Sequence, residues 1–284
     1  MKRSPVAVRW ATYTAVAIAF AIACAFLANW QFTRNADRAA QLELVESNYD
    51  APPVALADVI PPGGELSASA EWQPVLLSGE YLNDEQLLVR NRPHGGTAAF
   101  EVLVPFRLDD GRVLMVNRGW VPPGREGPEP DAVPAAPSGQ VDVLVRVRPG
   151  EPLPSSGRTA DEGQVPTINL PFIADRLSAE TAQELELSAY GIMASEDPAP
   201  ETRPVALSAP SEDPGPHLSY AIQWILFAIM GFIFIGYIIR TEIMARREEA
   251  EEDDTDAAPH PPAPTGRRRD RDAEDEDALL DAAR

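Results

Sequence analysis

The chain has few residues that bind metals or carry redox chemistry. Its single cysteine, Cys24, lies inside an apolar run, so it has neither a disulfide nor a Cys-x-x-Cys metal or redox motif. Between its two apolar segments only His94 and His217 are histidines, and His94-Gly95-Gly96 is typical of a turn. Gly-x-Ser-x-Gly, His-Glu-x-x-His and phosphate-loop motifs are also missing. We therefore expect that the protein is not an enzyme.

Acidic residues are absent from the first 28 positions, whereas they outnumber basic residues in the rest of the chain. The formal charge is −20 overall, +3 over residues 1–28 and −7 from Arg240 onward, which leaves −16 for residues 29–239. An acidic middle segment disfavours nucleic acid and anionic lipid headgroups as its partners. The segment after Glu248 has almost no large apolar residues, so we expect a disordered tail.

Two apolar segments are long enough to cross a lipid bilayer, whose hydrocarbon core is roughly 30 Å thick. One covers 18 residues, Trp10 to Leu27, and the other covers 22 uncharged residues, Leu218 to Ile239. Basic residues flank the outer ends of both, so the positive-inside rule places both termini in the cytoplasm. The predicted division is a cytoplasmic N-terminus 1–9, a span 10–28, an extracytoplasmic domain 29–217, a span 218–239 and a cytoplasmic disordered charged tail 240–284.

The first span has two alternative interpretations, a cleaved signal peptide and a lipid anchor on Cys24. The apolar run continues past Ala23-Cys24-Ala25, and the residues before the cysteine match a lipidation site poorly. A retained anchor is therefore favoured. The N-terminus lacks the character of a mitochondrial transit peptide, and the Ala, Pro and acid content is typical of a bacterial chain. We expect a multi-pass protein of a bacterial plasma membrane.

The segment between the spans has the pattern of one α+β domain. Residues 31–49 predict a helix that leaves the membrane and ends before Pro52, residues 50–71 a loop, residues 171–187 one or two helical turns, and residues 194–216 an extended return. Asp109-Asp110-Gly111 predicts a hairpin turn. The fold class is therefore two transmembrane helices bracketing an extracytoplasmic α+β domain with an antiparallel sheet or small open barrel. The predicted strands are residues 75–81, 87–92, 101–106, 113–121 and 141–147.

Three side chains mark the start of the second span. His217, Tyr220 and Trp224 are spaced i, i+3 and i+7, so they share one face of a helix. A titratable, metal-competent histidine at the outer membrane surface indicates a functional site. The alternative is that these residues only anchor the helix at the interface, as aromatic belts do.

Three motifs together resemble the surfeit-locus family of cytochrome c oxidase assembly proteins, over about residues 10–240. Leu27-Ala-Asn-Trp-Gln-Phe-Thr-Arg34 is similar to its Leu-Gly-x-Trp-Gln-x-x-Arg motif, with Ala28 in place of the usual glycine. Val116-Asn-Arg-Gly-Trp-Val-Pro122 resembles its central signature. His217-Leu-Ser-Tyr-Ala-Ile-Gln-Trp224 resembles its second-helix signature. The two-span arrangement also agrees.

The resemblance implies a factor that binds haem a or hands it over to the catalytic subunit of cytochrome c oxidase, with haem a synthase as a further partner. His217 would then be the axial ligand of the haem iron, and Tyr220 and Trp224 would flank the porphyrin. Trp30, Gln31 and Arg34 would hydrogen-bond or ion-pair with the haem propionates, since arginine matches a carboxylate. The alternative is a tryptophan of the membrane belt and a snorkelling or solvated arginine. The alternatives are an assembly scaffold or a cell-envelope binding module, neither of which binds haem.

Overall fold

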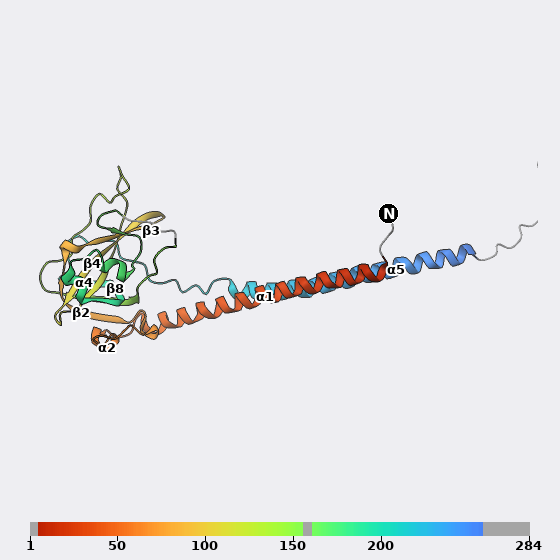
Figure 1. Ribbon diagram of the computed structural model, residues 1–284, viewed down its shortest axis with the longest axis horizontal. Helices are drawn as coiled ribbons and strands as arrows, with labels where there is room; N and C mark the ends of the chain where they lie inside the picture. Colours follow the sequence, from red (N-terminus) through yellow and green to blue (C-terminus); the bar gives the residue numbers. More distant parts are fainter. Residues whose placement is uncertain (1–4, 156–160, 258–284) are drawn as a thin grey trace, which may run out of the picture. The chain divides into compact units, whose positions relative to one another are not determined.

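The computed structural model describes residues 5–155 and 161–257, with side chains up to Glu251. It divides into two units. The helical unit comprises the described residues up to Trp30 and those from Ser219 onward, and the barrel unit comprises Gln31–Leu218. Two long helices, α1 (Val6–Asn48) and α5 (His217–Ala257), contribute to both units (Figure 1).

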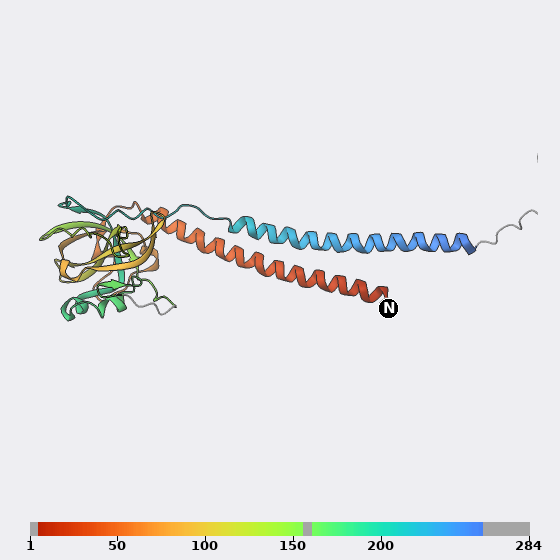
Figure 2. The same cartoon turned by 90° about the horizontal axis from the view of Figure 1, so that it is seen from above.

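In the helical unit α1 and α5 run antiparallel (Figure 2). Near the start of α1 the indole Nε1 of Trp10 donates a 3.0 Å hydrogen bond to the carboxylate of Glu242. Further along, a Cβ at Gly231 would lie 3.1 Å from the ring of Phe20, so the absence of a side chain lets the helices approach there. Both helices are long and apolar enough to cross a membrane, as expected from the sequence.

One boundary prediction is wrong. Residues 240–257 were assigned to a disordered tail, but α5 continues through them to Ala257. This stretch is rich in Glu and Arg, both of which have high helix propensity, and it extends a helix that is already nucleated. The remainder of the predicted tail, residues 258–284, lies outside the described residues.

The part of α1 beyond Trp30 is helical as predicted and ends against the barrel unit. Asn48, its last residue, donates hydrogen bonds of 2.8 Å to the backbone carbonyls of Ser69 and Glu71. Next to it the guanidinium of Arg146 lies 3.7 Å from the ring centre of Tyr49, a cation–π contact. These contacts fix the end of α1 on the barrel unit.

The barrel unit contains eight strands in the order β1-β2-β6-β8-β5-β4-β3-β7. Strand β2 pairs with β6 on one side and with β4 on the other, so β2, β6, β8, β5 and β4 close into a five-stranded barrel. The bounds are β1 Val54–Ala55, β2 Pro74–Tyr81, β3 Leu87–His94, β4 Thr97–Leu108, β5 Val113–Val121, β6 Val141–Pro149, β7 Gln164–Val165 and β8 Leu185–Asp197. The short helices are α2 Leu56–Val59, α3 Leu170–Ala174, α4 Ala179–Glu184 and the single 3-10 turns η1 Ala68–Ala70 and η2 Asn83–Glu85.

The prediction of strands is confirmed for five segments, but the predicted arrangement differs in two ways. The sheet is mixed, because β8 runs parallel to β5, β1 parallel to β2 and β7 parallel to β3. It is also closed by the β2–β4 pairing rather than open or flat. Strand β8 itself was missed: residues 185–187 were read as helical and 194–197 as part of an extended return. The predicted loop 50–71 also contains β1, α2 and η1.

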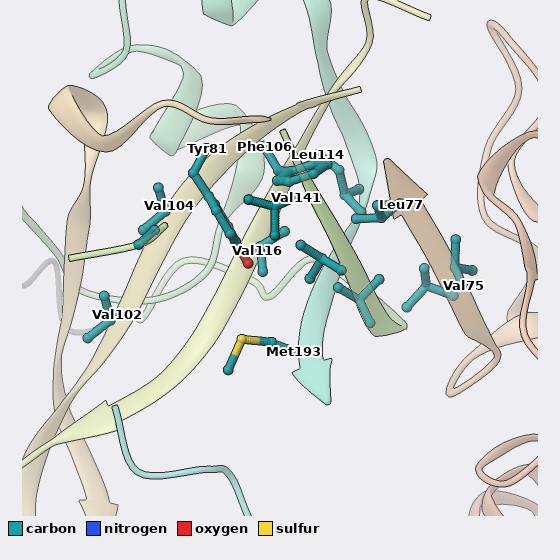
Figure 3. Packing of buried hydrophobic residues seen from close by; sticks show 14 of the residues in the cluster. Val75, Leu77, Tyr81, Val102, Val104, Phe106, Leu114, Val116, Val141 and Met193 are labelled. Carbon is teal, nitrogen blue, oxygen red and sulfur yellow. The ribbon is translucent and has the colours of Figure 1, made fainter. Parts of the chain in front are cut away.

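The barrel encloses the main hydrophobic core (Figure 3). Val75, Leu77, Phe106 and Leu114 are completely buried there. Each such side chain stabilises the fold by about 1.5–3 kcal/mol relative to leaving it exposed. A second cluster, which includes Leu103, lies on the other side of β4 and packs against α3. Strands β4 and β5 are therefore covered on both faces, which is why residues 99–106 and 113–119 are buried without alternation.

Candidate functional site

His217 is the first residue of α5 and contacts a side chain that lies 186 positions earlier. Its Nδ1 lies 2.9 Å from Oε1 of Gln31 on α1. Both residues belong to the barrel unit. Gln31 is buried, whereas His217 is half-buried. The sequence placed both residues among the candidates but gave no reason to pair them.

The pairing decides which ring nitrogen of His217 is available. An amide oxygen can only accept a hydrogen bond, so Nδ1 carries the proton and donates it to Gln31. The other nitrogen, Nε2, then has a free lone pair. A histidine that donates one N–H to a fixed acceptor and offers its second nitrogen has the arrangement of a metal or haem ligand in proteins.

The segment that leads into His217 is held in place from α1. The guanidinium of Arg38 donates hydrogen bonds to the carbonyls of Ser211, at 2.6 Å, and Asp213, at 3.0 Å. The Asp213 carboxylate in turn accepts from the backbone N–H of Gly215, whose φ of +74° suits glycine. Arg38 and Gln31 lie two turns apart on α1, so one helix positions both the approach to His217 and its ring.

The other predicted site residues are not brought into a described site. Trp30 and Tyr220 are each 47% exposed, Arg34 is exposed, and Trp224 packs edge-on against Phe227 at 5.7 Å between ring centres. Their roles stay predictions. No group of three or more His, Cys, Asp or Glu side chains in the described part of the chain could hold a metal ion.

The central signature has a structural role that its glycine explains. Gly119 has a φ of +122°, and an added Cβ would lie 2.4 Å from the carbonyl oxygen of Val205. The next residue, Trp120, exchanges two 2.8 Å backbone hydrogen bonds with Val205. This close backbone approach at Gly119 ties the return segment to β5. Arg118, before it, is fully buried and paired with Glu196.

A polar network was missed by the sequence analysis. His94, read as a turn residue, ends β3, and Gly95-Gly96 form the turn. Its ring stacks on Trp120 with 5.4 Å between ring centres, and its Nε2 lies 2.9 Å from the carboxylate of Glu101. Asn117 of the central signature donates to the same carboxylate at 2.8 Å. The sequence does contain an indication of this network, because Glu101 is a charged residue at the start of the otherwise apolar strand segment 101–106.

Comparison with known proteins agrees with the motifs. The model of the SURF1 family matches residues 18–229 of the chain. The chain belongs to the SURF1 family. This range contains both Gln31 and His217 and the whole barrel.

Relatives in this family occur in bacteria and eukaryotes. An uncharacterised SURF1-like protein of Mycobacterium tuberculosis is 35% identical over 248 residues, which cover 84% of this chain and 87% of the relative. A SURF1-like protein of Monosiga brevicollis is 32% identical over 143 residues, 44% of this chain and 50% of the relative. The cytochrome oxidase assembly protein Shy1 of Saccharomyces cerevisiae is 25% identical over 105 residues, 37% of this chain and 26% of the relative.

Proposed function

We propose that the protein is an assembly factor for haem–copper cytochrome c oxidase, and that His217 holds haem a by its iron on the way to the catalytic subunit. Membership of the SURF1 family and the similarity to the yeast cytochrome oxidase assembly protein Shy1 support the assembly role. The single observation that carries the haem role is the 2.9 Å contact from His217 Nδ1 to Gln31 Oε1.

The residues present fit a haem. Imidazole is a common axial ligand of haem iron, and the Gln31 contact leaves Nε2 of His217 for it. When bound, the haem would supply redox chemistry in the finished oxidase, whereas this chain's residues would bind and orient it. Gln31 would fix the tautomer and the ring plane of His217. Tyr220 and Trp224 would flank the porphyrin from α5, and Trp30 and Arg34 would face the propionates, where a guanidinium pairs with a carboxylate.

We also propose the membrane orientation. The chain would lie in a bacterial plasma membrane with both termini in the cytoplasm and the barrel unit outside, because basic residues flank the outer ends of both spans. His217 would then lie at the outer surface of the membrane. Attaching a reporter enzyme that is active only outside the cytoplasm after Pro137 and after Arg284 tests this; activity after Pro137 alone is the expected result.

The assembly role is tested by a reduced-minus-oxidised spectrum of membranes from a strain that lacks the protein. The strain must use the oxidase and have no paralogue that replaces the protein. Loss or reduction of the haem a signal, restored by the wild-type gene, is the expected result. An unchanged spectrum with normal oxidase activity would contradict the proposal and favour a cell-envelope binding module.

A further inference from the structure

A cavity of about 290 Å³ opens on the barrel unit, beside the polar network of His94 and Glu101. Its polar lining comes from β3, β4, β5, β6 and β8, and Leu207 and Pro210 of the return segment form one wall. This volume is near the lower end of the range for small-molecule pockets. It equals the liquid volume of roughly ten water molecules. The site is separate from the His217–Gln31 pair.

Tyr190 of β8 lines this cavity, and its hydroxyl has no hydrogen-bond partner in the described part of the chain. Only 3% of the residue is exposed. The hydroxyl oxygen itself is not sealed off from solvent, so a group that enters the cavity can reach it. Burial raises the pKa of Tyr190 to about 12, so the hydroxyl stays protonated at neutral pH and can donate.

Two arginines line the same cavity, and one of them has an unused donor. Arg148 uses Nε and Nη2 on one oxygen of Glu71 and stacks over Trp72 at 4.3 Å, which leaves its Nη1 without a partner among the described residues. Arg92 is committed to the two carboxylates of the lining, because its Nη2 bonds Glu151 and its buried Nε lies 3.4 Å from Glu101.

The two carboxylates that line the cavity already accept hydrogen bonds from the protein. Glu101 accepts from His94 and Asn117, one on each oxygen, and Glu151 accepts from Arg92, from the hydroxyl of Thr167 and from the backbone N–H of Ile168. The unused hydrogen-bonding capacity therefore consists of donors. A ligand that satisfies them must present acceptor oxygens.

The charge of the lining limits the ligand further. Arg92 and Arg148 balance Glu101 and Glu151, and Glu71 adds one negative charge beside them. A multiply charged anion such as phosphate would be repelled by these carboxylates and by the acidic domain. A single carboxylate can pair with Arg148 through a charge-assisted hydrogen bond and accept a second bond from Tyr190.

We propose that this cavity binds a carboxylate carried on a small apolar body, with Tyr190 and Arg148 on the carboxylate and Trp72, Ile192 and Leu207 around the body. The group could come from a free organic acid or from the C-terminal end of a polypeptide, which present the same carboxylate. The proposal does not depend on haem binding, because none of these residues belongs to the His217 site.

The test is a fluorine NMR titration of the purified full chain with 4-fluorobenzoate, with 4-fluorobenzamide as the uncharged control. We expect saturable binding of the acid with a dissociation constant on the order of millimolar, since the probe has few atoms, and no binding of the amide. Tyr190→Phe removes only the hydroxyl and should weaken binding about tenfold. Tyr81→Phe is the matched control, because the hydroxyl of Tyr81 is buried and, like that of Tyr190, unbonded, but does not line this cavity.

N-acetyl-4-fluorophenylalanine, titrated in parallel, distinguishes the two sources. Tighter binding than 4-fluorobenzoate assigns the site to a polypeptide end, and weaker binding assigns it to a free acid. The proposal is overturned if neither acid binds saturably, if the amide binds as well as the acid, or if Tyr190→Phe binds as tightly as Tyr81→Phe.

Discussion

Glu196→Gln should destabilise the barrel unit more than an ordinary surface change of the same kind. Arg118 and Glu196 are 0% and 1% exposed, with Nη2 2.8 Å from Oε1 and Nε 3.3 Å from Oε2. The remaining nitrogen of the guanidinium, Nη1, donates a 3.0 Å hydrogen bond to the backbone carbonyl of Pro134. Its guanidinium also lies 5.4 Å from the ring centre of Tyr81. Glu196 therefore supplies the counter-charge of the arginine and two of the three acceptors that its guanidinium bonds.

Glutamine has nearly the same shape but no charge, so the variant leaves a guanidinium buried without its anion. Breaking a buried ion pair by neutralising one partner costs about 3–5 kcal/mol. With a urea m-value of about 2 kcal/mol/M, the unfolding midpoint should fall by about 2 M. Replacing both partners, as Arg118→Met with Glu196→Leu, should recover most of this loss, because it removes both desolvated charges.

The assay is pulse proteolysis of the full chain in mild detergent across a urea series, with intact barrel unit as the readout. Glu180→Gln is the matched control, because it makes the same change at an exposed ion pair, 3.1 Å from Arg107, where the effect should be below about 1 kcal/mol. The reasoning is refuted if Glu196→Gln and Glu180→Gln shift the midpoint equally.

Two further predictions concern the same unit. Gly119→Ala should lower the urea midpoint by about 1 M or more, because its Cβ would lie 2.4 Å from the Val205 carbonyl oxygen at a φ of +122°; an unchanged midpoint would contradict this. Burial opposes ionisation of Glu151, yet hydrogen bonds and charge from Thr167 and Arg92 outweigh it and hold its pKa below the usual 4.5. Its contribution to stability should be complete well above pH 4.5 and decline as the pH falls through the folded-state pKa, and Glu151→Gln should flatten the stability profile there.

Features governed by local periodicity could be predicted from the sequence. The strand Val113–Val121 was predicted with its observed bounds, since its apolar run begins after the turn at Gly111. That glycine has a φ of +89°, the conformation that hairpin turns need. The two helices that are long and apolar enough to cross a membrane were found for the same reason, because each contains a long uncharged apolar run.

Features that depend on distant partners could not be predicted. Strand β8 lacks clean alternation and contains Gly191, where an added Cβ would lie 2.8 Å from the side chain of Val145, so its strand character comes from packing on β6. The parallel pairing of β8 with β5 needs a crossover connection, which no local pattern in the sequence predicts.

In the candidate site, too, local features could be predicted from the sequence, whereas contacts between distant residues could not. His217 stood out because a histidine at the start of an apolar span is conspicuous, and Gln31 was named only through a motif resemblance. Their hydrogen bond joins residues 186 positions apart and could not be read from either segment. The cavity at Tyr190 was invisible for a similar reason, since its lining comes from five strands and the return segment.

The most direct test of the haem proposal is the haem content of the full chain purified from cells that make haem a. We predict a reduced-minus-oxidised haem spectrum for the wild type, its loss in His217→Ala, and a reduced amount in Gln31→Leu, which removes the acceptor for Nδ1. His94→Gln, a change at a histidine outside this site, should leave the spectrum unchanged. Wild-type haem content in His217→Ala would contradict the ligand assignment, and absence of haem from the wild type would favour a scaffold that never binds it.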